Sequence, residues 1–335
     1  MFTKRVLSVA LLLISGCMLR AQQISLLTDG KLFSLRGLSV VTDQILWVSG
    51  SAGSVGLSTD GGLNWKWIQV PGFEKSDFRD IEAFSDQEAV IMGITEPAVV
   101  LYTTDGGTNW VTAFRDSSRS AFLDAMYFSG DQAWLIGDPE AGKILFAVSD
   151  DRGKTWRKRN PSGFESVASG EAFFAASGTN ISLTREGVPV LVSGGKKSCL
   201  YFDSNRFQLL MNQGEETTGA NSIAVNPFNT NEAFIVGGDF SHDTSRYRNA
   251  IRIQFEPFLE TVPLTPPGGY RSCVEYLDKN RMICCGTSGV DFSDDAGTHW
   301  KLISKRGFHT CRKSKTGNAV FLSGPRGSVG RLIVP

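Results

Sequence analysis

An eight-residue pattern, Ser/Thr-x-Asp-x-Gly-x-x-Trp, occurs four times in this 335-residue chain. The copies span residues 58–65, 103–110, 149–156 and 293–300. Their aspartates, Asp60, Asp105, Asp151 and Asp295, follow one another at intervals of 45, 46 and 144 residues. Because 144 is three times 48, the last interval predicts two degenerate copies, with Asp203 as the candidate remnant of one. Such regular repetition indicates a fold built from stacked copies of one small unit.

A longer unit repeats in step with the boxes. Each unit opens with an apolar segment and continues with a second one that ends in Gly. Seven units open at Arg36, Arg79, Leu123, Gly170, Ala220, Arg271 and Phe308, with spacings of 37 to 51 residues. Short alternating runs rich in Val, Ile, Phe and Trp, separated by Gly-containing turns, favour antiparallel hairpins over helices. A repeat of about 45 residues is the length of one four-stranded blade, so we predict an all-β, seven-bladed β-propeller of four-stranded antiparallel sheets.

The two ends of the chain complement each other in this scheme. The last unit ends at residues 331–334 with only about three strands, and residues 24–27 can supply the missing outer strand. Pairing the N-terminal strand with the last unit would close the ring and cover an exposed sheet edge. No linker or change of composition divides the chain after residue 22. We therefore expect a signal peptide in residues 1–21 and one propeller domain over residues 22–335.

The N-terminal segment has the layout of an export signal. Lys4 and Arg5 precede a nine-residue apolar stretch, 6–14, which is too short to cross a bilayer. Two cleavage sites compete: a lipobox that would lipidate Cys17, and an ordinary site after Ala21, which we favour. Either site predicts a secreted, periplasmic or outer-membrane-associated protein.

Composition excludes several classes of function. The 34 Lys and Arg residues balance 34 Asp and Glu residues, so the chain has no basic surface for nucleic acid. No apolar run is long enough for a membrane span, and no Gly-rich dinucleotide motif is present. The three histidines, His242, His299 and His309, are too scattered to ligate a metal, so we expect neither a metal nor a cofactor.

Five cysteines follow the signal segment, and an odd number cannot all pair within the chain. They are Cys199, Cys273, Cys284, Cys285 and Cys311. On a strand, Cys284 and Cys285 would point to opposite faces, so only one of them can face Cys273 or Cys311. The pattern is far from a disulfide scaffold, and the pairing stays open.

The residues also carry a family resemblance. The phrase 102–110 and the run Arg79-Asp80-Ile81-Glu82-Ala83-Phe84 are similar to those of exported bacterial propellers related to the photosystem II stability/assembly factor, and the four boxes resemble Asp-box (BNR) repeats. The resemblance covers residues 24 to 335 by pattern. It implies a non-catalytic, assembly-factor-like propeller. Because Asp-boxes also occur in sialidases and other glycosidases, a glycoside hydrolase is the alternative.

The box aspartates themselves are explained by turn structure. Asp and Ser/Thr side chains hydrogen-bond the backbone of a tight turn, and the Trp packs over the blade. We therefore look for the site elsewhere, at the start of each unit.

The polar residues that open the units are the candidate ligand-binding residues. The innermost strand of a propeller blade lines the central channel, so these side chains should meet at one mouth of the channel. Residues that follow the second segments belong to the same rim. The candidates are Arg36, Arg79, Asp80, Asp124, Glu171, Asn221, Arg271, His309, Asp138 and Asp239. The alternative at this point is that these charged groups pair with one another and only solvate the channel.

Two classes of function follow from these residues. A non-catalytic, monomeric propeller would bind an envelope protein or a glycan at the channel mouth, with arginines that suit carboxylates. A glycosidase would use Asp80, Asp124 and Glu171 as its acid and base. We favour the binding protein.

Overall fold

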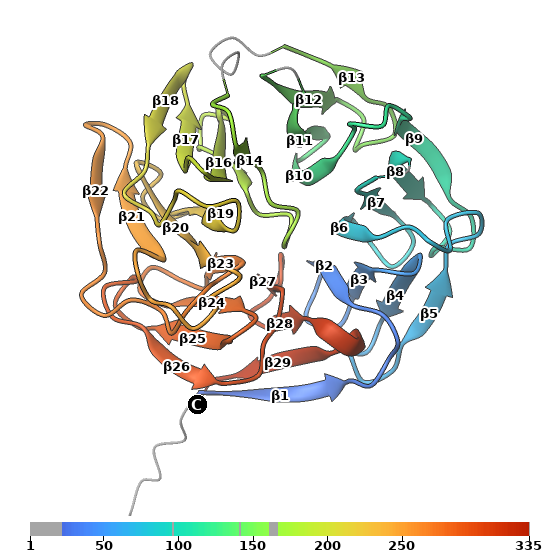
Figure 1. Ribbon diagram of the computed structural model, residues 1–335. Coiled ribbons are helices and arrows are strands. Elements are labelled where there is room, and N and C mark those ends of the chain that lie inside the picture. The colour runs from blue at the N-terminus through green and yellow to red at the C-terminus, as the bar shows by residue number, and fades with distance from the viewer. Residues whose placement is uncertain (1–21, 96, 141, 161–166, 335) are drawn as a thin grey trace, which may run out of the picture.

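The computed structural model of the protein describes residues 22–95, 97–140, 142–160 and 167–334. Apart from one 3-10 turn, η1 (Pro325–Gly327), the regular elements of these residues are β-strands. The strands form antiparallel sheets around a central axis (Figure 1). The predicted all-β propeller is therefore confirmed. The predicted signal peptide and Cys17 lie outside the described residues.

Four sheets consist of four strands that are consecutive along the chain, with the first strand innermost. Blade 1 contains β2 (Leu35–Val40), β3 (Leu46–Gly50), β4 (Ser54–Ser58) and β5 (Lys66–Gln69). Blade 2 contains β6 (Phe78–Ala83), β7 (Ala89–Gly93), β8 (Ala98–Thr103) and β9 (Val111–Asp116). Blade 3 contains β10 (Leu123–Ser129), β11 (Gln132–Glu140), β12 (Lys143–Ser149) and β13 (Arg157–Lys158). Blade 6 contains β23 (Cys273–Tyr276), β24 (Met282–Gly286), β25 (Gly289–Ser293) and β26 (Lys301–Ser304).

Blades 4 and 5 are joined at one residue pair, Gly194 with Gly219, into a nine-stranded sheet. Blade 4 contains β14 (Glu171–Ala172), β15 (Ile181–Leu183), β16 (Pro189–Gly195), β17 (Cys199–Phe202) and β18 (Asn205–Gln208). Blade 5 contains β19 (Thr218–Val225), β20 (Glu232–Asp239), β21 (Ala250–Gln254) and β22 (Leu259–Thr261). Both β14 and β15 pair with β16, so the innermost strand of blade 4 is interrupted.

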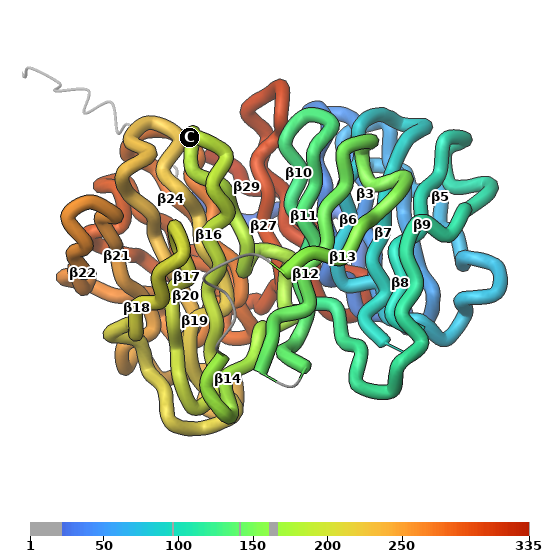
Figure 2. Tube along the Cα trace, turned by 90° about the horizontal axis from the view of Figure 1, so that it is seen from above, coloured from blue at the N-terminus to red at the C-terminus, as the bar shows by residue number. Residues whose placement is uncertain are grey.

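The N-terminal strand completes the last blade. Blade 7 contains β27 (Thr310–Lys313), β28 (Val320–Ser323), β29 (Val329–Ile333) and β1 (Gln23–Thr28). β1 pairs antiparallel with β29, from Gln23 opposite Ile333 to Thr28 opposite Val329. This confirms the predicted closure of the ring. Figure 2 shows the ring edge-on, with connecting loops at both of its faces.

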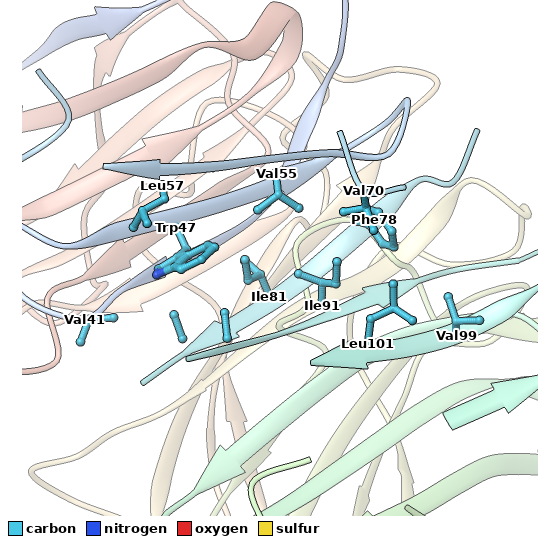
Figure 3. Packing of buried hydrophobic residues seen from close by; sticks show 12 residues of the cluster. Val41, Trp47, Val55, Leu57, Val70, Phe78, Ile81, Ile91, Val99 and Leu101 are labelled. Carbon is cyan, nitrogen blue, oxygen red and sulfur yellow. The ribbon is translucent and has the colours of Figure 1, made fainter. Parts of the chain in front are cut away.

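Apolar side chains fill the spaces between neighbouring blades. The described residues form seven buried clusters, and each cluster draws on two adjacent blades. Alternation along one strand explains this: Ala89 and Ile91 of β7 pack against blade 1, while Val90 and Met92 pack against blade 3. Figure 3 shows the cluster between blades 1 and 2. Seven interfaces agree with dividing the nine-stranded sheet into two blades, which gives seven sheets around the axis.

The four repeated boxes fold into the same turn. In the first box, the Ser58 hydroxyl donates to Asp60 Oδ1 at 2.9 Å and accepts from the Gly62 amide at 2.9 Å. Asp60 Oδ1 also accepts from the Asn64 amide, and Trp65 Nε1 donates to the Gly62 carbonyl. The other three boxes repeat these contacts at equivalent positions. These aspartates therefore have hydrogen-bonding roles within the turns that connect the outer strands.

All five described cysteines are buried and free. Cys285 packs in the cluster between blades 6 and 7 with Cys273 and Cys311, whereas Cys284 packs in the cluster between blades 5 and 6. The adjacent cysteines thus point to opposite faces of β24, as predicted for a strand.

Candidate functional site

The innermost strands of four blades carry a β-bulge at the same place. In β2 the register with β3 shifts across Arg36. Equivalent shifts fall at Arg79 in β6, Asp124 in β10 and Asn221 in β19. A bulge inserts one extra residue and redirects its side chain. These four candidates are therefore equivalent by structure, whereas alignment of the sequence units pairs Asp80 rather than Arg79 with Asp124.

A cavity of about 430 Å³ lies beside these bulges, and residues of all seven blades or their loops line it. We call it the mouth cavity. Five of the ten predicted residues line it: Arg36, Arg79, Asp138, Asn221 and His309. Sequence reasoning missed the rest of the lining, which includes Phe122, residues 172–176, Phe240, Tyr270, Ser272 and Thr287.

The cationic side of the mouth cavity is formed by Arg36 and Arg79. Arg79 pairs with Asp77, with Nε 2.8 Å from Oδ2. Arg36 makes no ion pair with a described carboxylate, and its Nη1 donates only a long hydrogen bond of 3.4 Å to the Ala176 carbonyl. Burial, and then the nearby charge of Arg79, lower the pKa of Arg36. Burial and the same two arginines lower the pKa of His309 to about 3, so this imidazole is neutral at neutral pH.

Another part of the cavity lining is aromatic. Phe174 and Phe240 meet edge to face with ring centroids 5.8 Å apart, and Phe240 meets Tyr270 in the same way at 6.1 Å. The Tyr270 hydroxyl donates to Asn221 Oδ1 at 2.8 Å, which fixes both side chains. Phe240 remains 45% exposed. The lining of the mouth cavity therefore combines an aromatic surface with two guanidinium groups.

A segment of blade 4 closes the channel beneath the cavity. We call residues 173–180, which connect β14 and β15, the plug; Figure 1 shows the chain beyond β14 reaching the middle of the ring. Three arginines of other blades donate to three consecutive plug carbonyls: Arg79 to Ala175 at 3.4 Å, Arg36 to Ala176 at 3.4 Å and Arg312 to Ser177 at 3.3 Å.

The remaining blades hold the plug as well. Ser177 donates to the Ser272 carbonyl of the chain leading into blade 6, and Thr179 donates to Ser222 of blade 5. The Phe173 amide donates to Asp138 of blade 3 at 3.0 Å. Six blades thus hold a segment of the seventh, and much of the polar lining that the sequence predicts as a ligand site is satisfied by the chain itself.

Three carboxyl groups lie around the plug. Asp80 is buried, accepts from the amides of Met126 and Ile81 at 2.7 and 2.9 Å, and has its pKa raised by burial to about 7. Asp124 is fully buried with no hydrogen bond of normal geometry to either carboxyl oxygen. Burial and the neighbouring Asp138 raise the pKa of Asp124 well above its usual range. Burial also raises the pKa of Asp138, the one of the three that lines the mouth cavity.

Two predicted residues are committed to ion pairs inside their own blades. Arg271 is fully buried and binds Asp291 of the same blade through Nε, 2.7 Å from Oδ2, and through Nη2. Glu171 binds Arg206 of β18 at 2.9 Å and accepts from Tyr201 and Ser193. Neither side chain lines the mouth cavity, which corrects their assignment as ligand-binding residues.

A third predicted residue is occupied within its own loop. Asp239 accepts hydrogen bonds from Ser241 and contacts His242 at 2.9 Å. These local contacts outweigh burial and lower the pKa of Asp239. Its neighbour Phe240, rather than Asp239, lines the cavity.

A second cavity of about 310 Å³ lies on the other side of the plug. Its lining includes Glu82, Glu275, Arg312, Lys313 and Lys315 together with Gly178 and Thr179 of the plug. Sequence analysis missed Arg312, which lies three residues after His309 and has no counterpart in the repeat pattern. Burial raises the pKa of Glu275 to about 7, while Arg312 and Lys313 oppose the shift.

Over the described residues, no group of three or more His, Cys, Asp or Glu side chains has the arrangement of a metal site. Over the same part of the chain, no helix has the length and apolarity needed to span a bilayer.

No protein-family model and no curated protein matches this sequence. Solved structures do match. A structure described as YCF48 bound to D1 peptide has a TM-score of 0.65 and 16% identity over 94% of this chain and 97% of that one. YCF48 from Cyanidioschyzon merolae has a TM-score of 0.62 and 16% identity, with 92% and 98% covered. The WD40 β-propeller domain of Doa1 has a TM-score of 0.64 and 11% identity, with 94% and 97% covered.

The chain shares its fold with these propellers. At such low identity the likeness concerns the fold alone, so the function has to be argued from the site.

Proposed function

We propose that this chain is a non-catalytic, exported propeller that captures a segment of a partner protein at the mouth cavity. The observation that supports this most directly is Arg36, a largely buried cation without an ion-pair partner among the described residues, on the wall of a cavity of about 430 Å³. An unpaired buried charge is costly, and an anionic group of a ligand would compensate it.

The fold likeness is consistent with a protein partner. The matching YCF48 structure is described as bound to D1 peptide, which shows that a propeller of this shape can bind a peptide. In our proposal the partner belongs to the cell envelope, as the predicted export signal implies, and the propeller acts as a monomer.

The chemistry of the mouth does not favour a glycosidase. Most glycoside hydrolases use two carboxyl groups that flank the substrate. Of the three predicted catalytic carboxylates, Asp80 and Asp124 are buried around the plug and Glu171 is paired with Arg206. Among the described residues, Asp138 is the carboxylate that lines the mouth cavity.

The proposal is tested by removing the two guanidinium charges. Site-specific photo-crosslinking from position 240 in the native envelope should join the wild-type propeller to one protein, identified by mass spectrometry. Arg36→Gln combined with Arg79→Gln should lose that adduct and retain a cooperative thermal transition.

The matched control removes two charges far from the mouth. Arg115→Gln and Lys301→Gln change exposed residues on the outer strands β9 and β26 and should leave the adduct unchanged. An adduct of undiminished yield in the folded mouth variant would contradict the proposal.

A further inference from the structure

The mouth cavity is a dead end. Ala175 and Ala176 of the plug line the mouth cavity, and Gly178 and Thr179 line the second cavity, so the plug separates the two. Contacts from the six other blades fix the plug in place, as described above. A chain therefore cannot pass along the axis. A ligand that enters the mouth must end there or turn back.

The charged side chains of the cavity determine whether a ligand that binds there is anionic or cationic. Arg36 and Arg79 are on adjacent blades, and each donates a hydrogen bond of 3.4 Å to a plug carbonyl, which is long for a guanidinium donor. Arg79 is also paired with Asp77, so Arg36 is the arginine of this lining without an ion pair to a described carboxylate. Guanidinium groups bind a carboxylate through two parallel hydrogen bonds, and such charge-assisted bonds are shorter and stronger than bonds to a neutral carbonyl. A cationic chain terminus would be repelled by the same groups.

The aromatic wall, formed by Phe174, Phe240 and Tyr270, determines which kind of group accompanies the anionic group of the ligand. These three side chains form a continuous edge-to-face series in the same lining as the two arginines. A cavity of about 430 Å³ is within the size range of pockets for small groups, and its neutral His309 adds no positive charge to that of the arginines. The site therefore favours a ligand in which an anionic group and an apolar group are only a few atoms apart.

We infer that the mouth cavity binds the free C-terminal carboxylate of a partner chain whose last residue is apolar. This inference rests on the proposed function and specifies its ligand. A C-terminal residue carries the carboxylate and its side chain on the same carbon, so the carboxylate can reach Arg36 and Arg79 while the side chain packs on Phe240. An internal Asp or Glu would use its own side chain to reach the arginines. Only neighbouring residues of the ligand chain could then contact the aromatic wall.

The test uses defined peptide pools as probes. Ten-residue peptides with mixed sequence and a fixed final Leu are labelled at the N-terminus and made in two forms, with a free C-terminal carboxylate and with a C-terminal amide. A third pool ends in Asp with a C-terminal amide and keeps one carboxylate. Retention on the immobilised propeller is measured for each pool. We expect the free-acid Leu pool to be retained at least about tenfold more than either amidated pool.

Two variants separate the parts of the inference. Arg36→Gln should reduce retention of the free-acid Leu pool to that of its amide. A fourth pool ends in Ser with a free carboxylate, and the wild type should retain it less than the free-acid Leu pool. Phe240→Ala, at a half-exposed position, should keep the preference for the free acid but lose this preference for Leu over Ser. Thermal unfolding checks that each variant is folded.

Equal retention of the free-acid and amidated pools would overturn the inference. Equal retention of the free-acid Leu pool by the wild type and by Arg36→Gln would overturn it as well. Because the crosslinking experiment uses the native partner whatever its sequence, loss of its adduct in the mouth variant would still uphold the proposed function in that case.

Discussion

At the scale of single residues, the environment of a charged side chain decides its role more than its type does. Arg36 and Arg271 occupy corresponding places at the openings of their units. Arg271 is enclosed with Asp291, and a buried ion pair of this kind is costly to break because the remaining charge would be uncompensated. Arg36 has no such partner among the described residues and faces a cavity. Of these two arginines, only Arg36 is therefore available to a ligand.

The raised pKa of Asp80 predicts how the stability of the protein depends on pH. Burial raises the pKa of Asp80 from 3.8 to about 7, so from about pH 8 down to pH 5 the folded state takes up a proton that the unfolded chain does not. The contribution of Asp80 to the free energy of unfolding should therefore rise as the pH falls through about 7, by up to about 1.4 kcal/mol per pH unit, and this stabilisation is lost again above pH 7. Asp80→Asn should lose this contribution and differ from the wild type in slope, while the contributions of Glu275 and His309 remain in both proteins. Urea unfolding at pH 5, 6, 7 and 8 measures it.

The control for this experiment is Asp60→Asn in the first box. Hydrogen bonds from Asn64 lower the pKa of Asp60, so this carboxyl does not titrate between pH 5 and 8 and the variant should keep the wild-type slope. Identical slopes for Asp80→Asn and the wild type would show that Asp80 is ionised throughout this range.

At the scale of elements, blade 4 differs from its neighbours because its innermost strand is divided into β14 and β15. The residues between them leave the sheet and form the plug. Gly178 makes this path possible: it has φ +68, and a Cβ there would lie 2.3 Å from the Asp80 carboxyl group. The plug therefore packs closely against the Asp80 carboxyl group of blade 2, and Gly178 leaves no space there for a side chain.

Gly178→Ala tests this fit. The substitution adds backbone strain at a positive φ and forces a methyl group against a carboxyl that two backbone amides hold in place. Gly187→Ala is the matched control because Gly187 has φ +81 but open space around its Cβ position. We expect Gly178→Ala to reduce the free energy of unfolding by roughly 1–3 kcal/mol more than Gly187→Ala does, measured by urea unfolding. Equal losses would mean that the plug can move away from Asp80 at no cost.

At the scale of the whole molecule, the ring depends on a join between its two ends. Each blade packs through apolar clusters on two neighbours, so a ring that opens at one interface exposes two apolar faces. β1 joins residues near the start of the described chain to β29 and covers the edge of blade 7. A continuous ring also keeps the seven innermost strands, and hence the arginines of different blades, around one cavity.

Removal of β1 should weaken this closure. A chain that starts at residue 30 should unfold at least ~5 °C below the chain that starts at residue 22, since for a protein of this size each kcal/mol corresponds to roughly 2–4 °C. It should also associate in solution through the exposed edge of β29. Differential scanning calorimetry and light scattering measure the two effects.

A synthetic peptide of residues 22–28, added in trans, should restore part of the lost stability, whereas a scrambled peptide should not. The point substitution Leu32→Ala is a further control, because Leu32 is 104% exposed and should have no effect. An unchanged unfolding temperature in the truncated chain would show that β1 contributes nothing to closure.

The sequence by itself determined the architecture of this protein. The spacing of the boxes predicts the blades, the short alternating apolar runs predict antiparallel hairpins, and the short last unit predicts the role of residues 24–27. These features can be read because they are local and repeat: a strand and its turn depend on residues that are neighbours along the chain. Five of the ten candidate site residues line the mouth cavity, and their role in binding a ligand stays a prediction.

Only the tertiary structure decided which charged side chains line a cavity and which are paired within the protein. The bulges that make Arg36 and Arg79 equivalent to Asp124 and Asn221 shift the register by one residue, and nothing in the repeat marks them. The plug is an interruption of one strand, and its partners Arg36, Arg79 and Arg312 come from three other blades. Whether a buried charge is paired depends on residues that are far apart along the chain, so it is settled by how the ring closes rather than by any local pattern.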